Sequence, residues 1–326
     1  MNILVTGGSG YIGSKLVERL AKTNHYVTVY ETQIFGNPIE HLASDRIRFV
    51  EGDIRNPKKL KTQLSRIDVA VHLAGVVTDE LVDMNPTFGS SVNIDGTRNV
   101  IKACKWNGVR RLIYASSSSV YGSTAQDVVP DEGHTPEPQT QYAKQKLKGE
   151  RLVMDYEGEK TAVRQATAMG PAPRMRLDTV VNIFSKQAYY DGVITPYGGE
   201  QYRSNIHVAD TAELYLKLIE SDKERIDGQV WNWTDENLPV KEIAYRVAEV
   251  ARSRGIKCEV KLVNIKDERS YRLNADKAKR LLNISPQRGV AGAAADNFDF
   301  FKTSGIDPND DVYFNNRRMA DVVKGV

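Results

Sequence analysis

A tyrosine and a lysine four residues apart, Tyr142 and Lys146, form the pair with the clearest chemical use. Residues at this spacing share one face of a helix, and the pattern through Met154 is helical. A free tyrosine has a pKa of about 10 and is a poor base at neutral pH, but a nearby ammonium group favours the phenolate. The pair is therefore a candidate general base, although such pairs are also common on solvated helices.

Four consecutive hydroxyl groups, Ser116 to Ser119, follow the apolar run at residues 111–115 and precede Tyr121. The run predicts a buried strand. Ligands in open α/β sheets bind at the carboxyl ends of the strands, where this loop would lie. Taken alone the loop could be a serine-rich turn. Its combination with Tyr142 and a glycine turn at the start of the chain favours a binding site.

That glycine turn contains Gly7, Gly10 and Gly13, between an apolar run at residues 3–5 and a helical pattern at 16–20. Strand, glycine turn and helix together are typical of a dinucleotide site. One glycine allows the tight turn, one lets a pyrophosphate approach the backbone, and one packs the helix close to the sheet. The free N–H groups of the helix N-terminus would then face the phosphates. A connecting turn without a ligand is the alternative.

An acid follows the second predicted strand at Glu31, 18 residues past Gly13. This is close to where dinucleotide folds place an acid on the adenosine ribose. The next residues, Thr32 and Gln33, provide no positive charge for a 2′-phosphate, which favours NAD over NADP. A surface glutamate at a strand end is the alternative. Asp53 follows the third predicted strand and could accept a hydrogen bond from adenine, or be a turn aspartate.

Strands and helices alternate through the first half, which predicts an α/β fold with a doubly wound parallel (Rossmann) sheet. We expect a first domain at residues 1–170 and a smaller, mainly substrate-binding α/β domain at residues 171–326, some segments of which pack back on the first. The predicted strands are 3–5, 26–30, 47–50, 69–73, 111–115, 230–233 and 258–263, and the main helices are 86–106, 140–157 and 240–254.

Composition indicates an ordinary globular protein, with 40% apolar and 27% charged residues. A net charge of +3 is too small to indicate nucleic acid or a membrane surface as a partner. The two cysteines, Cys104 and Cys258, form no metal-binding or disulfide pattern, and we expect a reducing, cytoplasmic location. We expect no secretory leader and no membrane span, because no apolar run approaches about 18 residues.

Together these motifs resemble the extended short-chain dehydrogenase/reductases that modify nucleotide sugars, most closely the UDP-galactose 4-epimerase type. The resemblance covers nearly the whole chain, and it is much more specific for the superfamily than for the substrate. It depends on Gly7-Gly8-Ser9-Gly10-Tyr11-Ile12-Gly13, Glu51-Gly52-Asp53-Ile54, His72-Leu73-Ala74-Gly75, Asn93, Ser116 to Gly122, and Tyr142 to Lys146.

The resemblance implies catalytic roles for Ser117, Tyr142 and Lys146. Ser117 lies four residues before Tyr121 in a Ser-x-x-x-Tyr-Gly pattern, which marks it as the catalytic serine. NAD is the implied cofactor, and no metal is expected. The implied NAD-binding residues are Gly7, Gly10, Tyr11, Ile12, Gly13, Glu31, Asp53, Ile54, Leu73, Ala74, Gly75, Asn93, Tyr142 and Lys146.

The reaction implied by the resemblance is epimerisation at C4 of a nucleotide-diphosphate sugar. Tyr142 would remove the proton of the sugar 4-hydroxyl while Ser117 hydrogen-bonds the reacting oxygen. The C4 hydride would pass to NAD and return to the other face of a transient 4-keto sugar. Relatives commonly dimerise through the helices that correspond to 86–106 and 140–157, so we also expect a homodimer.

Two departures bear on the reaction and the substrate. Related 4,6-dehydratases carry Asp-Glu where Ser118 and Ser119 stand, and decarboxylating relatives also use a glutamate in this loop. Their absence favours the epimerase. A 4,6- or 5,6-dehydratase, a 4-keto reductase and a non-catalytic NAD-binding protein are the alternatives. Thr167 and Met169 replace an asparagine and a tyrosine that are usual in the family, which leaves the sugar and the nucleotide open.

The second half carries most of the expected substrate contacts. Arg174 and Arg176 lie in a basic loop and could reach a phosphate or a sugar acid, or be exposed loop arginines. We interpret His72 and His207 as structural and Asp210 as a helix N-cap, and we assign no role to the polar tail after Gly305. The expected substrate-binding residues are Ser117, Ser118, Thr167, Arg176, Asn182, Thr195, Tyr197, Arg203 and Arg269.

Overall fold

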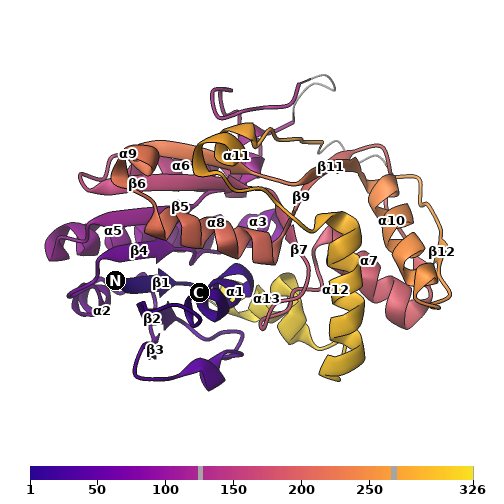
Figure 1. Ribbon diagram of the computed structural model, residues 1–326, viewed down its shortest axis with the longest axis horizontal. Helices are drawn as coiled ribbons and strands as arrows, with labels where there is room; N and C mark the ends of the chain where they lie inside the picture. Colours follow the sequence, from indigo (N-terminus) through magenta and orange to yellow (C-terminus); the bar gives the residue numbers. More distant parts are fainter. Residues whose placement is uncertain (124–127, 266–269, 326) are drawn as a thin grey trace.

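The computed structural model describes residues 1–123, 128–265 and 270–325. Its centre is a seven-stranded sheet with the order β10-β6-β5-β4-β1-β2-β3, in which every neighbouring pair is parallel (Figure 1). The prediction of a doubly wound parallel sheet is therefore confirmed. The strands are β1 (Asn2–Thr6), β2 (Tyr26–Glu31), β3 (Ile47–Glu51), β4 (Val69–His72), β5 (Arg111–Ala115), β6 (Glu159–Gln165) and β10 (Gln229–Trp233).

The strand order reverses at β1. Val5 of β1 pairs with Val29 of β2 on one side and with Val71 of β4 on the other. The chain passes from β1 to β2 and β3 on one side and then crosses to β4 on the other side of β1. This reversal opens a crevice at the carboxyl ends of the strands. The loops after β1, β2 and β4 all begin at this crevice, so they form the walls of any ligand site there.

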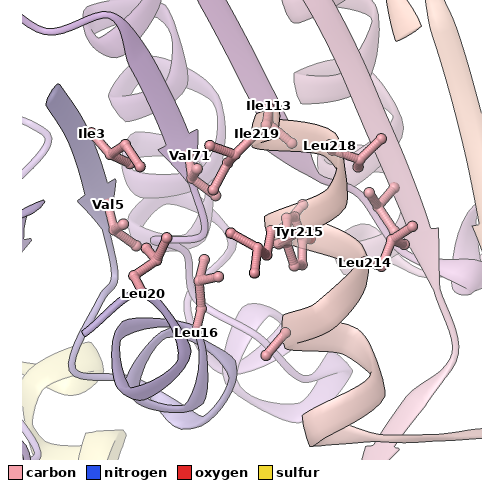
Figure 2. Close-up of a cluster of buried hydrophobic side chains, with 14 of the residues drawn as sticks. Ile3, Val5, Leu16, Leu20, Val71, Ile113, Leu214, Tyr215, Leu218 and Ile219 are labelled. Carbon is pink, nitrogen blue, oxygen red and sulfur yellow. The ribbon is translucent and has the colours of Figure 1, made fainter. Parts of the chain in front are cut away.

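Two helices from distant parts of the chain cover one face of the sheet. These are α1 (Tyr11–Leu20) and α8 (Val208–Glu220). Figure 2 shows Leu16 and Leu20 of α1 and Tyr215 of α8 converging on the valines and isoleucines of the strands, in one buried apolar cluster. Because α1 begins at the glycine turn, this packing fixes the position of the turn relative to the sheet.

The opposite face carries α2 (Pro57–Gln63), α5 (Thr97–Asn107) and α6 (Gln141–Met154). The single helix predicted at residues 86–106 is divided into α4 (Pro86–Ser90), a π-helical turn (Ser91–Gly96) and α5. Within the π turn, Asn93 is buried, and its side-chain amide bonds both backbone polar groups of Val76. Such π turns are often found at functional sites.

The rest of the chain forms a second apolar core around Val181, Val247 and Phe298. It contains a three-stranded sheet of order β11-β9-β7, a pair β12-β8 and the helices α7, α10 and α12 (Figure 1). The strand predicted at residues 258–263 is shorter than expected. The elements are β7 (Thr167–Met169), α7 (Val180–Lys186), β8 (Val193–Ile194), β9 (Tyr202–His207), β11 (Glu236–Pro239), α10 (Val240–Ser253), β12 (Glu259–Val260) and α12 (Gly289–Ser304).

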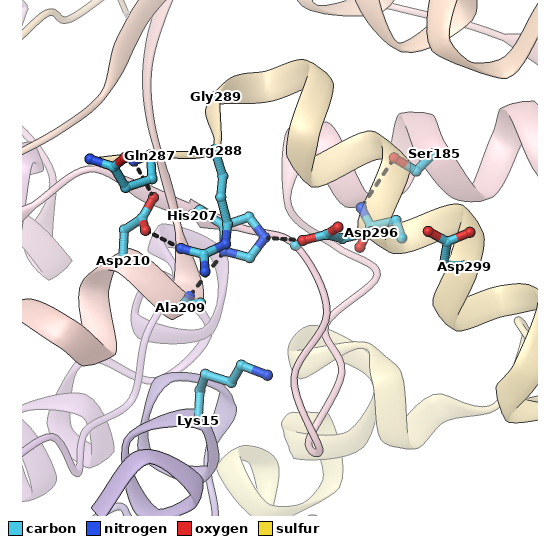
Figure 3. A network of polar contacts seen from close by, with 12 residues as sticks. Lys15, Ser185, His207, Ala209, Asp210, Gln287, Arg288, Gly289, Asp296 and Asp299 are labelled. Carbon is cyan, nitrogen blue, oxygen red and sulfur yellow. Dashed lines mark hydrogen bonds and ion pairs between the residues drawn. The ribbon is translucent and has the colours of Figure 1, made fainter. Parts of the chain in front are cut away.

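A polar network ties α8 to the segment that begins α12 (Figure 3). The predicted N-cap role of Asp210 is wrong, because His207 caps α8 by accepting a hydrogen bond from the N–H of Ala209 at 3.1 Å. Asp210 instead accepts a bond from the N–H of Gln287 and pairs with Arg288. A carboxylate two residues inside the helix is free to pair with Arg288 once another residue caps the end. His207 is structural, as predicted.

The polar tail after Gly305, for which we expected no role, contains helix α13 (Asn315–Lys324). Met319 and Val323, four residues apart on one face, pack in a small apolar cluster with Leu81 and Val82 of α3. The polar composition concealed this narrow apolar face. The remaining α-helices of the described chain are α3 (Asp79–Met84), α9 (Lys223–Ile226) and α11 (Asp276–Leu282).

Candidate active site

The glycine turn has the geometry that pyrophosphate binding needs. Gly7 has a φ of 73°, which favours glycine. A Cβ on Gly13 would lie 2.1 Å from the carbonyl oxygen of Gly7, so only glycine lets α1 pack this close. A Cβ on Gly10 would meet only that oxygen, at 3.1 Å, and would otherwise fill the space in front of the turn. α1 starts at Tyr11 without a side-chain cap, so its first N–H groups face the same space.

Two acids follow the neighbouring strands. The carboxylate of Glu31 accepts hydrogen bonds from the backbone and side chain of Thr32, and burial raises the pKa of Glu31 above its ordinary value. Nε and Nη2 of Arg55 both donate to one carboxylate oxygen of Asp53, Oδ2, at 2.9 and 2.6 Å, and the other oxygen accepts from the backbone N–H of Arg55. The arginine therefore occupies the Asp53 carboxylate, whereas Glu31 retains acceptor capacity for ribose hydroxyls. These residues fit the adenosine half of NAD.

The serine loop divides its hydroxyl groups between structure and the site. Ser116 is buried and donates to Glu150 of α6 at 2.5 Å. Glu150 in turn pairs with Arg164 of β6 at 2.6 Å, and both side chains are buried. Ser117 lies above this network, where its Oγ is 2.8 Å from the Oγ of Ser119. The ion pair beneath the loop thus holds Ser117 at the end of β5.

Tyr142 projects from the first turn of α6 toward Ser117. The hydroxyl group of Tyr142 is close enough to Ser117 for that side chain, together with the positive charge of Arg176, to lower the pKa of Tyr142. Burial outweighs both and raises that pKa to about 12. The sequence had led us to expect a neighbouring cation to dominate. The phenol is therefore the stable form in this protein, and it can hold or release a proton at its Oη.

Lys146 lies one turn along α6 and is only 4% exposed. Its Nζ is 4.5 Å from the centre of the Tyr114 ring, and burial lowers the pKa of Lys146 to about 7, although Glu150 opposes the change. The ammonium group is thus poorly compensated. It could be stabilised by hydroxyl acceptors, such as those of the nicotinamide ribose, that enter the cavity.

A cavity of about 570 Å³ joins these parts. Its size and mixed lining are those of a small-molecule site. The structure brings the following predicted residues together in its wall: Gly7, Gly10, Tyr11, Ile12, Gly13, Glu31, Asp53, Ile54, Leu73, Ala74, Gly75, Ser117, Ser118, Tyr142, Lys146, Thr167, Arg176 and Arg203.

Two predicted asparagines lie behind the wall. Asn93 holds the backbone of Val76, and its Oδ1 would be 2.9 Å from a Cβ on Gly75, so it positions that loop without lining the cavity. Asn182 is fully buried, accepts a bond from the N–H of Gly170 and donates to the hydroxyl of Tyr11. Both amides are already satisfied by protein groups, so the structure places them as supports rather than as direct ligands.

Two of the predicted substrate-binding residues, Thr195 and Tyr197, are also apart from the cavity wall. The N–H of Thr195 donates to the side chain of Gln187, and Tyr197 is 60% exposed. Arg203 does reach the wall, with its guanidinium 5.3 Å from the centre of the Tyr271 ring. Arg269 lies outside the described residues.

The cavity wall includes residues that sequence reasoning did not assign. From the α3 side come Thr78, Asp79 and Glu80, and from α13 come Asn315, Asn316, Met319 and Val322. Asp178 contributes from the basic loop, together with Arg174, which the sequence indicated as a possible phosphate or sugar-acid ligand. The sequence placed Arg174 in a loop, but no local motif in the tail predicted helix α13. No group of three His, Cys, Asp or Glu residues in the described chain could hold a metal, and no described helix is long and apolar enough to cross a membrane.

Comparison with known proteins gives the family. A sequence model of the NAD dependent epimerase/dehydratase family matches residues 3–233. N-acetyl-alpha-D-glucosaminyl-diphospho-ditrans,octacis-undecaprenol 4-epimerase from Escherichia coli O157:H7 is 28% identical over 77% of this chain and 72% of its own. UDP-N-acetyl-alpha-D-glucosaminuronate decarboxylase from Bacillus cytotoxicus is 27% identical over 82% of this chain and 84% of its own.

Solved structures agree with this placement. UDP-glucuronic acid 4-epimerase from Bacillus cereus, in complex with UDP-glucuronic acid and NAD, is 26% identical with a TM-score of 0.82. The match covers 93% of this chain and all of that one. The cofactor expected from Glu31 and the glycine turn is thus the cofactor of the family. This chain belongs to the NAD-dependent epimerase/dehydratase family.

Proposed function

We propose that the protein catalyses NAD-dependent epimerisation at C4 of a nucleotide-diphosphate sugar. The observation that carries the proposal is that Tyr142 and Ser117 line one cavity with Lys146 and the glycine turn, with Ser117 close enough to lower the pKa of Tyr142. Hydroxyl groups, rather than acids, fill the loop at residues 116–119. This arrangement suits removal and return of a proton at one sugar oxygen.

Each residue of the set has a separate task. Tyr142 takes the proton of the 4-hydroxyl and later returns it, while Ser117 holds the same oxygen by a hydrogen bond. Lys146 binds ribose hydroxyls, and its positive charge favours the phenolate of Tyr142. Bound NAD supplies reversible acceptance of the C4 hydride. Because the same tyrosine serves both directions, the chain needs no second acid or base.

Elimination or decarboxylation is the main alternative, since one relative is a decarboxylase. Such reactions need an additional acid or base near the sugar. Ser118 and Ser119 stand where the acids of related dehydratases would be, which supports epimerisation. Asp79 nevertheless lies in the cavity wall, close enough for its charge to raise the pKa of Tyr142. This carboxylate makes the alternative worth testing directly.

The direct test is incubation of the purified protein with a panel of nucleotide sugars without added coenzyme. We expect a product of unchanged mass and inverted C4 configuration, identified by mass spectrometry and NMR. Loss of water or of carbon dioxide would replace the proposal with one of the alternatives. Stoichiometric consumption of NADPH would instead identify a 4-keto reductase. No reaction with a broad panel would favour the non-catalytic alternative.

The largest effect on activity is expected from Tyr142→Phe. The variant keeps the ring and loses only the proton-transferring hydroxyl, so turnover should fall by about a thousandfold or more while NAD stays bound. Tyr245→Phe is the matched control, because Tyr245 is 46% exposed on α10 and does not line the cavity. Full activity in Tyr142→Phe would refute the assigned base.

We also propose that the protein is a homodimer that pairs through α5 and α6. Trp106, near the end of α5, is 71% exposed and has the ammonium group of Lys61 only 3.3 Å from its ring centre. A large aromatic side chain left in solvent is a common feature of association surfaces. Light scattering should give twice the monomer mass, and Trp106→Glu should shift the protein toward the monomer.

A further inference from the structure

Arg174 is a buried cation in the wall of the cavity. It is 4% exposed, and in the described part of the chain it forms no ion pair. Its Nη2 donates to Asn315 Oδ1 at 2.6 Å, while its Nε has no hydrogen-bond partner among the described residues. Burial and the charge of neighbouring Arg176 lower the pKa of Arg174 to about 9. A buried charge of this kind is costly unless an anion reaches it.

The position of Arg174 indicates which anion. The residue lines the cavity, and its guanidinium stacks 3.9 Å from the centre of the Phe35 ring, in the loop after β2. Its backbone N–H donates to Ser14 of α1. The guanidinium is close enough to both Tyr11 and Glu31 for their charges to affect its pKa. Arg174 therefore lies between the start of α1, which would face the pyrophosphate, and Glu31, which would bind the adenosine ribose.

The C-terminal helix holds Arg174 in this position. Asn315 begins α13, and its side chain is the hydrogen-bond acceptor for the guanidinium. The N–H of Asn315 donates to Asp178, which also pairs with Arg176 at 2.8 Å. The start of α13 is thus fixed to the loop that carries Arg174.

The same helix spans the crevice. Arg318 donates to the carbonyl of Ile34 in the loop after β2, at 2.9 Å. On the other side, Asn316 accepts a bond from Thr78 at 2.8 Å, and Asn85 donates to the carbonyl of Val323. The loops after β2 and β4 flank β1, so α13 crosses the site where the dinucleotide would lie.

We propose that Arg174 is a direct ligand of the NAD pyrophosphate and that helix α13, through Asn315, keeps it in place. The C-terminal helix is then a part of the cofactor site that determines how tightly the dinucleotide is retained. A guanidinium matches two phosphate oxygens, and a charge-assisted bond inside a closed site is strong. The inference depends on the NAD dependence of the family and not on the sugar or the reaction.

The test measures binding, by calorimetry, of NAD, ADP-ribose and UDP to the full-length protein after removal of cofactor. Arg174→Gln should lower the affinities for NAD and for ADP-ribose by the same factor, about 10- to 100-fold, because both ligands contain the pyrophosphate. UDP, which probes the diphosphate site of the sugar substrate, should bind as in the wild type. Asn315→Ala should lower the NAD affinity by a smaller factor, because the guanidinium of Arg174 remains but loses its hydrogen bond to Asn315.

Matched controls separate these effects from general loss of charge or of folding. Arg254→Gln removes an arginine that pairs with Asp299 outside the cavity, and Asn309→Ala removes an exposed asparagine of the tail. Both should leave NAD affinity unchanged. Should Arg174→Gln fail to fold, Arg174→Lys and Asn315→Ala carry the test. Each should bind NAD less tightly than the wild type.

Two results would overturn the inference. One is a loss of UDP affinity in Arg174→Gln with NAD and ADP-ribose unaffected, which would assign the arginine to the substrate diphosphate. The other is wild-type NAD affinity in both Arg174→Gln and Asn315→Ala. Because the measurements are of binding alone, they stand even if the protein proves not to be an epimerase, and a failed inference leaves the proposed reaction intact.

Discussion

The two walls of the cavity are built in different ways. One wall is made by the ends of β1, β2, β4 and β5 with the helices that follow, and its residues come from short motifs such as Gly7 to Gly13 and Ser116 to Ser119. The other is made by the loop with Arg174 and by α13, which are joined by Asn315 across a large separation in sequence. The first wall contains the proposed catalytic residues, and the second lies across the crevice from them.

The difference lies in what positions the side chains. In the sheet wall, parallel pairing and buried contacts beneath the loops hold the groups, so each motif has a rigid support. In the second wall, a few polar bonds such as Arg174 to Asn315 and Arg318 to Ile34 connect separate segments. Mutations in the buried contacts beneath the first wall should therefore lower the stability of the fold, whereas mutations in the second wall should mainly lower ligand affinity.

The largest stability effect is expected from Glu150→Ala, beneath the serine loop. The change leaves Arg164 buried without its partner and removes the acceptor for Ser116, which should cost about 3–5 kcal/mol in the free energy of unfolding. Urea denaturation measures it. Glu157→Ala is the control, because that side chain is 83% exposed and its solvated pair with Lys105 should contribute little to stability. Equal losses in the two variants would contradict a rigid support.

A smaller, pH-dependent effect is expected from Lys146. Its pKa is lowered from 10.5 to about 7 in the folded protein, so between these values the unfolded chain binds the extra proton. Stability from this group therefore rises with pH across that window, by about 1.4 kcal/mol per pH unit.

The measurement compares cofactor-free wild type with Lys146→Met. From pH 7 to pH 9 the difference in the free energy of unfolding should move in favour of the wild type by roughly 2–3 kcal/mol. If this difference in the free energy of unfolding did not change with pH, Lys146 would be solvated or paired in solution. Water would then reach this part of the sheet wall.

The smallest effects should separate two glycines of the same turn. Gly13→Ala forces a Cβ against the Gly7 carbonyl at 2.1 Å and should destabilise the fold by about 1–3 kcal/mol. Gly10→Ala meets only a 3.1 Å contact, so thermal stability should change little, while NAD affinity should fall about tenfold because the methyl group occupies the phosphate approach. Thermal unfolding and NAD titration of both variants give the comparison. Loss of NAD affinity without destabilisation in Gly13→Ala would reverse the assigned roles.

Much of the sheet wall could be predicted from the sequence because its signals are local. Strand, glycine turn and helix are consecutive, and Tyr142 and Lys146 share one helix face. Asn93 and Asn182 could not be placed correctly, since only the folded backbone shows that their amides are already bonded to protein groups. Which groups a buried amide bonds is decided only when the chain is packed.

The sequence by itself determined the alternating fold, the dinucleotide turn with Glu31, and the pairing of a serine loop with Tyr142. These depend on periodicity and spacing, which are readable within a short window. Only the tertiary structure decided that burial dominates the pKa of Tyr142 and that a polar tail becomes a helix across the crevice. Burial and contact between distant segments arise when the chain is packed, and no short window contains them.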